Sequence, residues 1–209
     1  MTAGVRKKNA GAPRSIREGL DLFLWPLLNI FVRLNLKPNG LTIIGVILSI
    51  PVTWCLARGE WIAAALWLLG AGFFDVLDGA LARGTRSAGI FGAFFDSTMD
   101  RISEALVFLG FILYYCGNQD LIRAGLAFAV CFLSQLISYT RARAEGLGLR
   151  NDQGWVTRPV RILLLAGGLL IGQPAAILWI LAVLSLVTVF QRIDHVFQMT
   201  KRIRKTKTN

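Results

Sequence analysis

Histidine and cysteine are scarce in this sequence, and several kinds of catalytic and metal site depend on them. The three cysteines, Cys55, Cys116 and Cys131, lie in or near apolar segments and lack the paired spacing of zinc ligands. We therefore expect unreactive core residues and no disulfide framework. The single histidine, His195, lies at the end of the last apolar segment, where we expect a surface residue rather than a catalyst.

Charged residues are also sparse, at 17% of the 209 residues, whereas hydrophobic residues make up 55% and the mean hydropathy is +0.57. A chain of this size and composition is too apolar to form a soluble domain. Residues 1–19 lack the apolar core of a cleavable signal peptide, so we expect none. The composition therefore predicts a membrane protein.

Apolar runs recur along the chain at the length that an α-helix needs to cross a bilayer. We expect six spans, at residues 40–57, 61–82, 89–116, 121–143, 157–172 and 174–193. The predicted fold is an all-α integral membrane protein with six transmembrane helices. It divides into a basic N-terminal region with an amphipathic helix (1–37), a six-span domain (38–195) and a basic cytoplasmic tail (196–209).

The segment 14–36 differs from the spans because charged residues interrupt its apolar pattern. The apolar residues that recur at helical spacing are Ile16, Leu20, Phe23, Leu24, Leu27 and Leu28. Arg17, Glu18 and Asp21 occupy other positions. This pattern predicts an amphipathic helix in the membrane interface, kinked at Pro26. A turn at residues 37–40 (Lys-Pro-Asn-Gly) should follow it.

Basic residues gather at both ends of the chain and in the connections between spans two and three and between spans four and five. The remaining connections have only Arg58 and Arg123 nearby. Because positive residues mark the cytoplasmic side, both termini should face the cytoplasm. The same arrangement explains the net charge of +11, with basic tails touching anionic lipid head groups. The tail at 201–209 has no interleaved aromatic residues, so we expect no nucleic-acid partner.

Four aspartates lie between long apolar runs, at positions 75, 78, 96 and 100. An ionised side chain near the centre of a bilayer costs about 2.5–3.5 kcal/mol on insertion scales, so these residues need cations. Asp75 and Asp78 are three residues apart and Asp96 and Asp100 four apart, so each pair shares a helix face. Hard carboxylate oxygens suit Mg²⁺, Mn²⁺ or Ca²⁺. Two such ions can clamp the attacking and leaving oxygens of a phosphoryl displacement.

The aspartates belong to a longer pattern with fixed spacing. Its eight positions are Asp75, Asp78, Gly79, Ala82, Arg83, Gly92, Asp96 and Asp100. The pattern resembles the signature of the CDP-alcohol phosphotransferase family, membrane enzymes that make phospholipid head groups, and the resemblance extends over about residues 38 to 193. It implies attack by an alcohol on the phosphorus nearest the lipid in CDP-diacylglycerol or CDP-archaeol, with release of CMP. It also implies Mg²⁺ or Mn²⁺, two ions in our expectation, and a homodimer.

The resemblance also gives the residues roles. Asp75, Asp78 and Asp96 would hold the metal, and Asp100 would act as a metal ligand, as the base that takes the proton of the attacking hydroxyl, or as both. The residues expected to bind the CDP group are Gly79, Ala82, Arg83, Asn39, Thr42 and Gly92. Pro38, Asn39 and Thr42 resemble a Pro-Asn-x-x-Thr element that would help to hold the cytidine. The alternative for that element is a helix start with Asn39 as the N-cap.

The acceptor should be a phosphorylated alcohol, with inositol 1-phosphate as the first expectation. Residues 138–146 resemble the corresponding stretch of phosphatidylinositol-phosphate and archaetidylinositol-phosphate synthases. The arginines that would receive the acceptor's phosphate are Arg141, Arg143, Arg158 and Arg161. The cytoplasmic location of these helix ends also accounts for arginines there. Residues 156–161 lack the acidic residues that those relatives carry beside the arginines, which leaves phosphatidylglycerophosphate synthesis from glycerol 3-phosphate open.

An ion-coupled membrane transporter is the alternative of another class, because carboxylates in apolar segments also mark ion pathways. A transporter would place them near the middle of the membrane, next to interrupted helices. Here all four lie near the predicted cytoplasmic ends of spans two and three, and Arg83 beside them suits an anionic ligand. The sequence therefore favours the transferase, with its site facing the cytoplasm.

Overall fold

The computed structural model describes Leu28, Phe31 and residues 37–84, 89–149, 154 and 157–208. Within these ranges every regular element is an α-helix, as predicted. The helices are α2 (Pro38–Ala57), α3 (Trp61–Gly84), α4 (Ile90–Gly117), α5 (Leu121–Gly146), α6 (Arg158–Leu170) and α7 (Pro174–Thr208). One helix therefore corresponds to each of the six predicted spans.

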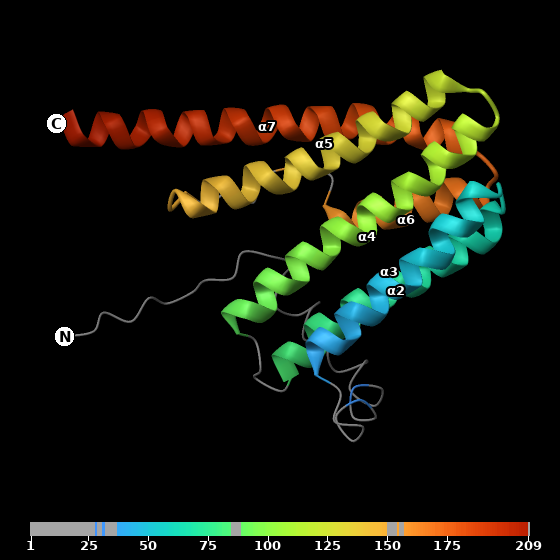
Figure 1. Cartoon of the computed structure of the whole chain (residues 1–209). Helices are drawn as coiled ribbons and strands as arrows, with labels where there is room; N and C mark the ends of the chain where they lie inside the picture. The colour runs from blue at the N-terminus through green and yellow to red at the C-terminus, as the bar shows by residue number, and fades with distance from the viewer. Residues whose placement is uncertain are drawn as a thin grey trace.

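Helix boundaries agree with the predicted spans to within three residues, except at the end of α7. This helix runs through the last predicted span and on to Thr208 without interruption, so the predicted tail begins inside it. After Pro174 the helix has no proline or glycine, and its last part is rich in lysine and arginine, which are good helix formers. Figure 1 shows α7 continuing beyond the end of α5 toward the C-terminus.

Residues 37–40, predicted as a turn, form the start of α2: the helix begins at Pro38, and Gly40 N–H donates to the Lys37 carbonyl oxygen at 2.9 Å. Lys37 is the N-cap, with extended backbone angles and no capping hydrogen bond from its side chain, so the alternative with Asn39 as the N-cap is wrong. Proline is favoured in the first helical turn, where its missing N–H has no helical partner to lose. The Pro-Asn-x-x-Thr element therefore occupies the first turn of α2.

The predicted amphipathic helix at 14–36 lies outside the described residues apart from Leu28 and Phe31. Leu28 is buried in a small apolar cluster with Leu41 of α2 and Leu77, Ala80 and Leu81 of α3, and Phe31 packs against that cluster. Leu28 and Phe31 therefore contact the ends of α2 and α3 that carry the signature residues.

Four helices, α2, α3, α5 and α7, are long and apolar enough to cross a membrane by length and composition. Helix α4 has 28 residues, but it carries Asp96, Asp100, Arg101 and Glu104. Helix α6 has 13 residues, which rise about 20 Å, less than the hydrocarbon thickness of about 30 Å. The chain is a multi-pass membrane protein in which the two remaining helices complete the bundle.

Contacts between the helices form a closed ring in the order α2, α3, α6, α7, α5, α4 and back to α2. The apolar core lies inside this ring and includes Phe108 and Phe111 of α4 and Leu178 and Leu181 of α7. Helix α6 contacts α3 on one side and α7 on the other, so it links these two helices in the ring. Figure 1 shows α6 between α3 and α7.

All three cysteines are free, as expected, but only Cys55 is buried. Cys131 is half-buried, and Cys116 is exposed in the last turn of α4, so the expectation of three core residues is wrong for Cys116. His195 lies on α7 and lines neither of the two cavities described below.

Gly110 allows α4 to pack closely against α2. A Cβ atom at this position would lie 2.8 Å from both the Thr53 carbonyl oxygen and Leu56 Cβ. Beside this crossing, Thr53 Oγ1 donates a hydrogen bond to the Leu106 carbonyl oxygen across the two helices. The backbone of α2 cannot yield as a flexible side chain would, so the crossing requires glycine.

Replacing Gly110 by alanine should therefore destabilise the protein by about 1–3 kcal/mol, the usual cost of overpacking. The melting temperature in detergent should fall by about 2–12 °C in a chain of this size. Gly125→Ala on α5 is the matched control, because a Cβ there meets nothing within 4 Å. An equal melting temperature for the two variants would contradict the close crossing.

Candidate active site

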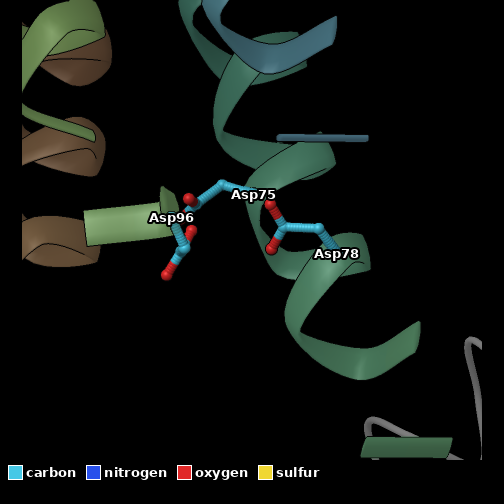
Figure 2. A group of neighbouring side chains, drawn as sticks. All are labelled: Asp75, Asp78 and Asp96. Carbon is cyan, nitrogen blue, oxygen red and sulfur yellow. The ribbon is translucent and has the colours of Figure 1, made fainter. Parts of the chain in front are cut away.

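Three of the four predicted metal ligands converge between α3 and α4. Asp75 and Asp78 come from α3 and Asp96 from α4, and one carboxylate oxygen of each lies within 4.8 Å of the others. Figure 2 shows the three carboxylates approaching one another from the two helices. Asp78 is buried, and the other two are half-buried.

The surroundings of this aspartate cluster fit a divalent cation. Asp78 Oδ2 accepts a hydrogen bond of 2.7 Å from Thr42 Oγ1, whereas Asp96 Oδ1 is buried and has no hydrogen-bond partner. Three carboxylates this close repel one another unless a cation lies among them. Their hard oxygens are the ligands that Mg²⁺ and Mn²⁺ prefer.

Asp100, the fourth aspartate, lies one turn beyond Asp96 and is not part of the cluster. Its Oδ1 forms an ion pair with Nη1 of Arg158, and the same nitrogen donates to Oδ1 of Asp75. Arg158 Nη2 also donates to Ser103 Oγ at 3.1 Å. The arginine therefore joins the predicted base to one of the predicted metal ligands.

A first cavity, here called the Gly79 cavity, opens beside the aspartate cluster. All six residues predicted to bind the CDP group line it, namely Asn39, Thr42, Gly79, Ala82, Arg83 and Gly92. A Cβ on Gly92 would lie 3.6 Å from Asn39 Oδ1, and one on Gly79 would lie 3.2 Å from Arg83 Nη1. Small residues here leave space beside the helix backbone, so a flat ring or a phosphate can approach the backbone closely.

A second cavity, here called the Arg161 cavity, lies between α2, α3, α4 and α6. Its apolar walls include Leu68, Val107 and Phe108, and its charged lining residues are Asp75, Asp78, Asp100, Glu104, Arg158 and Arg161. Thr42 and Asp78 line both cavities. The hydrogen-bonded pair of Thr42 and Asp78 therefore stands between the two.

The four arginines predicted to bind the acceptor's phosphate do not lie together. Arg158 and Arg161 both line the Arg161 cavity, as their i,i+3 spacing on one helix predicts. Arg141 and Arg143 lie near the exposed C-terminal end of α5 and line neither cavity. Arg141 Nε pairs there with Glu145 Oε1 at 2.9 Å.

Two residues of the Arg161 cavity, Ser103 and Glu104, were not predicted as part of a site. Glu104 follows Asp96 and Asp100 at the same four-residue spacing, so all three share one face of α4. That spacing, extended by one more turn, was the signal that would have found Glu104. Nothing comparable in the sequence marks Ser103.

Comparison with known proteins places this arrangement in a family. The model of the CDP-alcohol phosphatidyltransferase family matches residues 35–191, which include the whole aspartate pattern and both cavities. The chain belongs to this family. It is therefore a membrane transferase of phospholipid synthesis, and family membership favours the transferase over the transporter.

Curated relatives within the family share most of their length with this chain. Phosphatidylinositol phosphate synthase of Mycobacteroides abscessus is 36% identical over 194 residues, which cover 86% of each chain. Archaetidylinositol phosphate synthase of Methanothermobacter thermautotrophicus is 35% identical over 176 residues, covering 81% of this chain and 87% of the relative.

The crystal structure of Mycobacterium tuberculosis phosphatidylinositol phosphate synthase with CDP-DAG bound has a TM-score of 0.77 to this chain. The two are 32% identical, and the match covers 82% of this chain and 92% of the other. A second structure of the same synthase is a complex with manganese and citrate. The relative's metal agrees with the oxygen-rich donor set of the aspartate cluster.

Proposed function

We propose that this protein transfers the phosphatidyl group of a CDP-linked lipid to inositol 1-phosphate and releases CMP. The observation that carries the proposal is the placement of two cavities on either side of Asp78. The residues of the CDP signature line one of them, and two arginines line the other. The relatives named above are by name synthases of phosphatidylinositol phosphate and archaetidylinositol phosphate, and their similarity extends over most of the chain.

In this proposal the Gly79 cavity takes the CDP group of the donor. Arg83 offers a planar fork that matches phosphate oxygens, and Gly79 and Gly92 leave room for the nucleotide. Asp75, Asp78 and Asp96 would hold the divalent metal beside the donor's pyrophosphate. A bound divalent ion neutralises the pyrophosphate and stabilises the charge that develops on the departing CMP. We propose two ions, Mg²⁺ or Mn²⁺.

The acceptor enters the Arg161 cavity, where Asp100 can act as the base. A carboxylate oxygen of Asp100 takes the proton of the attacking hydroxyl as the new bond to phosphorus forms and the bond to CMP breaks. Arg158 holds Asp100 through an ion pair, and Ser103 holds Arg158 through a hydrogen bond. These contacts fix the orientation of the carboxylate before the acceptor arrives.

Arg161 is the arginine whose contacts best suit the acceptor's phosphate. Its ion pair with Glu104 joins Nε to Oε1 at 2.9 Å. The guanidinium is buried and lines the cavity, so its remaining N–H donors are positioned in a low-dielectric site. An anion there would form charge-assisted hydrogen bonds without first displacing the pair with Glu104.

We propose that the active site and both termini face the cytoplasm. Basic residues, which mark the cytoplasmic side, gather at both chain ends and in the connections between spans two and three and between spans four and five. The donor is CDP-diacylglycerol or CDP-archaeol, and the enzyme works as a homodimer.

The test uses purified protein in liposomes with CDP-diacylglycerol and Mg²⁺. CMP release is measured with inositol 1-phosphate, glycerol 3-phosphate, inositol and serine supplied separately. We expect release only with inositol 1-phosphate. Release with glycerol 3-phosphate alone would keep the reaction and overturn the acceptor. No release with any acceptor, with Mn²⁺ and CDP-archaeol also supplied, would overturn the proposal.

A further inference from the structure

A buried line of polar contacts joins three helices behind the Arg161 cavity. Ser134 on α5 donates a hydrogen bond of 2.5 Å to Oε1 of Glu104 on α4. The same oxygen lies 2.9 Å from Nε of Arg161 on α6. The Glu104 side chain is 10% exposed, the Arg161 residue 2% and Ser134 not at all. The order is therefore Ser134, Glu104, Arg161 and then the cavity.

Stability alone does not account for a charged pair at this depth. Removing two charges from water is costly, and well-packed apolar residues of similar volume are often as stabilising as a buried ion pair, or more so. The second carboxylate oxygen of Glu104, Oε2, is buried without a hydrogen-bond partner, which adds to the cost. Because these costs are not offset by stability, we look for the role of Glu104 in the orientation of the Arg161 guanidinium.

The contact between Glu104 and Arg161 uses one edge of the guanidinium. A guanidinium is planar, and its N–H groups lie in a fixed fork. The contact with Glu104 is an ion pair, and Arg161 Nε forms no aligned hydrogen bond. Because the fork is rigid, the attraction of the carboxylate for the Nε side also favours one direction of the two terminal amino groups. Ser134 limits the rotation of the Glu104 carboxylate from a third helix. Since α6 and α4 are not neighbours in the helix ring, the arginine needs such a contact to keep one orientation across the cavity.

We propose that Glu104 is a positioning residue for substrate selection, which orients Arg161 to bind the phosphate of the acceptor alcohol. The inference rests on the proposed function, because it assigns the acceptor's phosphate to the Arg161 cavity. Glu104 itself does not touch the acceptor or the reacting atoms. It acts through Arg161, as the residues behind a metal ligand act through that ligand.

The decisive variant is Glu104→Gln, which keeps the size of the side chain and removes its charge. We expect the KM for inositol 1-phosphate to rise about tenfold, since hydrogen bonds to charged groups contribute at about this level. The KM for CDP-diacylglycerol should stay within about twofold. Glu104→Asp, which keeps the charge, should recover part of the loss. Ser134→Ala should raise the acceptor KM by a smaller factor.

The matched control is Glu60→Gln. Glu60 Oε1 and Arg58 Nε form the same type of pair at the same 2.9 Å, but at an exposed position. This variant should leave both KM values unchanged. Calorimetric titration with inositol 1-phosphate and with inorganic phosphate gives a readout that does not depend on turnover, and Glu104→Gln should weaken both.

The outcomes separate this inference from the proposed function. An unchanged acceptor KM and phosphate affinity in Glu104→Gln, with an active wild type, would overturn the inference alone. An equal loss for both substrates would show a structural role and overturn it too. If Glu104→Gln fails to fold, Ser134→Ala decides by the same two readouts. A wild type that uses no phosphorylated alcohol, but whose affinity for inorganic phosphate falls in Glu104→Gln, would overturn the proposed function and leave the positioning role.

Discussion

Replacing Asp78 by asparagine should abolish CMP release, by about 10³-fold or more, while the folded protein stays in the membrane. Asp78 is the buried member of the aspartate cluster and lines both cavities. Asparagine keeps the shape of the side chain and an oxygen that can accept the hydrogen bond from Thr42. The variant therefore removes one negative charge from the cluster and little else. Without that charge the site holds a divalent ion weakly, and the donor's pyrophosphate loses its counter-charge.

Two measurements check this prediction: the rate of CMP release and the affinity for Mn²⁺ followed by electron paramagnetic resonance. Both should fall together. Asp194→Asn on α7 is the matched control, because Asp194 is exposed and lines neither cavity. Full activity in Asp78→Asn would remove the basis for assigning the metal to the cluster.

Replacing Asp100 by asparagine should give the second large effect, with a different signature. We expect kcat to fall by about 10²–10⁴-fold, the contribution of a well-placed base. The affinity for Mn²⁺ should change little, because Asp100 lies outside the group of three oxygens that converge on the metal. The acceptor KM should also stay close to its original value, since Arg161 and Glu104 remain in place.

The same pair of assays decides whether Asp100 is a base, a ligand or both. A loss of Mn²⁺ affinity equal to that of Asp78→Asn would make Asp100 a metal ligand. A loss of kcat alone would assign it to proton transfer. The Asp100 variant also breaks the ion pair with Arg158, so Arg158→Met is needed beside it. A smaller loss of kcat in Arg158→Met than in Asp100→Asn would separate the base from the residue that orients it.

Most of the fold follows from the sequence because each helix depends on local signals. The apolar runs have the length of a membrane span, and residues 171–173 separate α6 from α7, next to the boundary between the predicted spans 157–172 and 174–193. The predicted last span ends before α7 does for a physical reason: hydropathy reports where the apolar run ends, whereas the helix ends only where its backbone is interrupted. The residues predicted as a turn before α2 form its first turn, because proline is typical of both a turn and the first turn of a helix.

The site was predictable to the extent that it lies on short segments of chain. The spacing of Asp75, Asp78 and Asp96 was enough to expect a cluster, and the three residues lie together. The partners of Arg158 and Arg161 come from α3 and α4, more than fifty residues earlier in the chain. No periodicity connects positions so far apart. The four arginines were grouped on the resemblance to inositol-phosphate-using relatives, whereas helix packing separates those of α5 from those of α6.

The late position of α6 in the chain has a consequence for biosynthesis. The aspartates are complete at residue 100, but the guanidinium that pairs with Asp75 and Asp100 is added 58 residues later. At about 5–20 residues per second, a ribosome needs about 3–12 s to reach it. During this interval the nascent chain carries carboxylates at the membrane without the arginine of α6. The insertion of the last two helices therefore completes both the bundle and the charge balance of its active site.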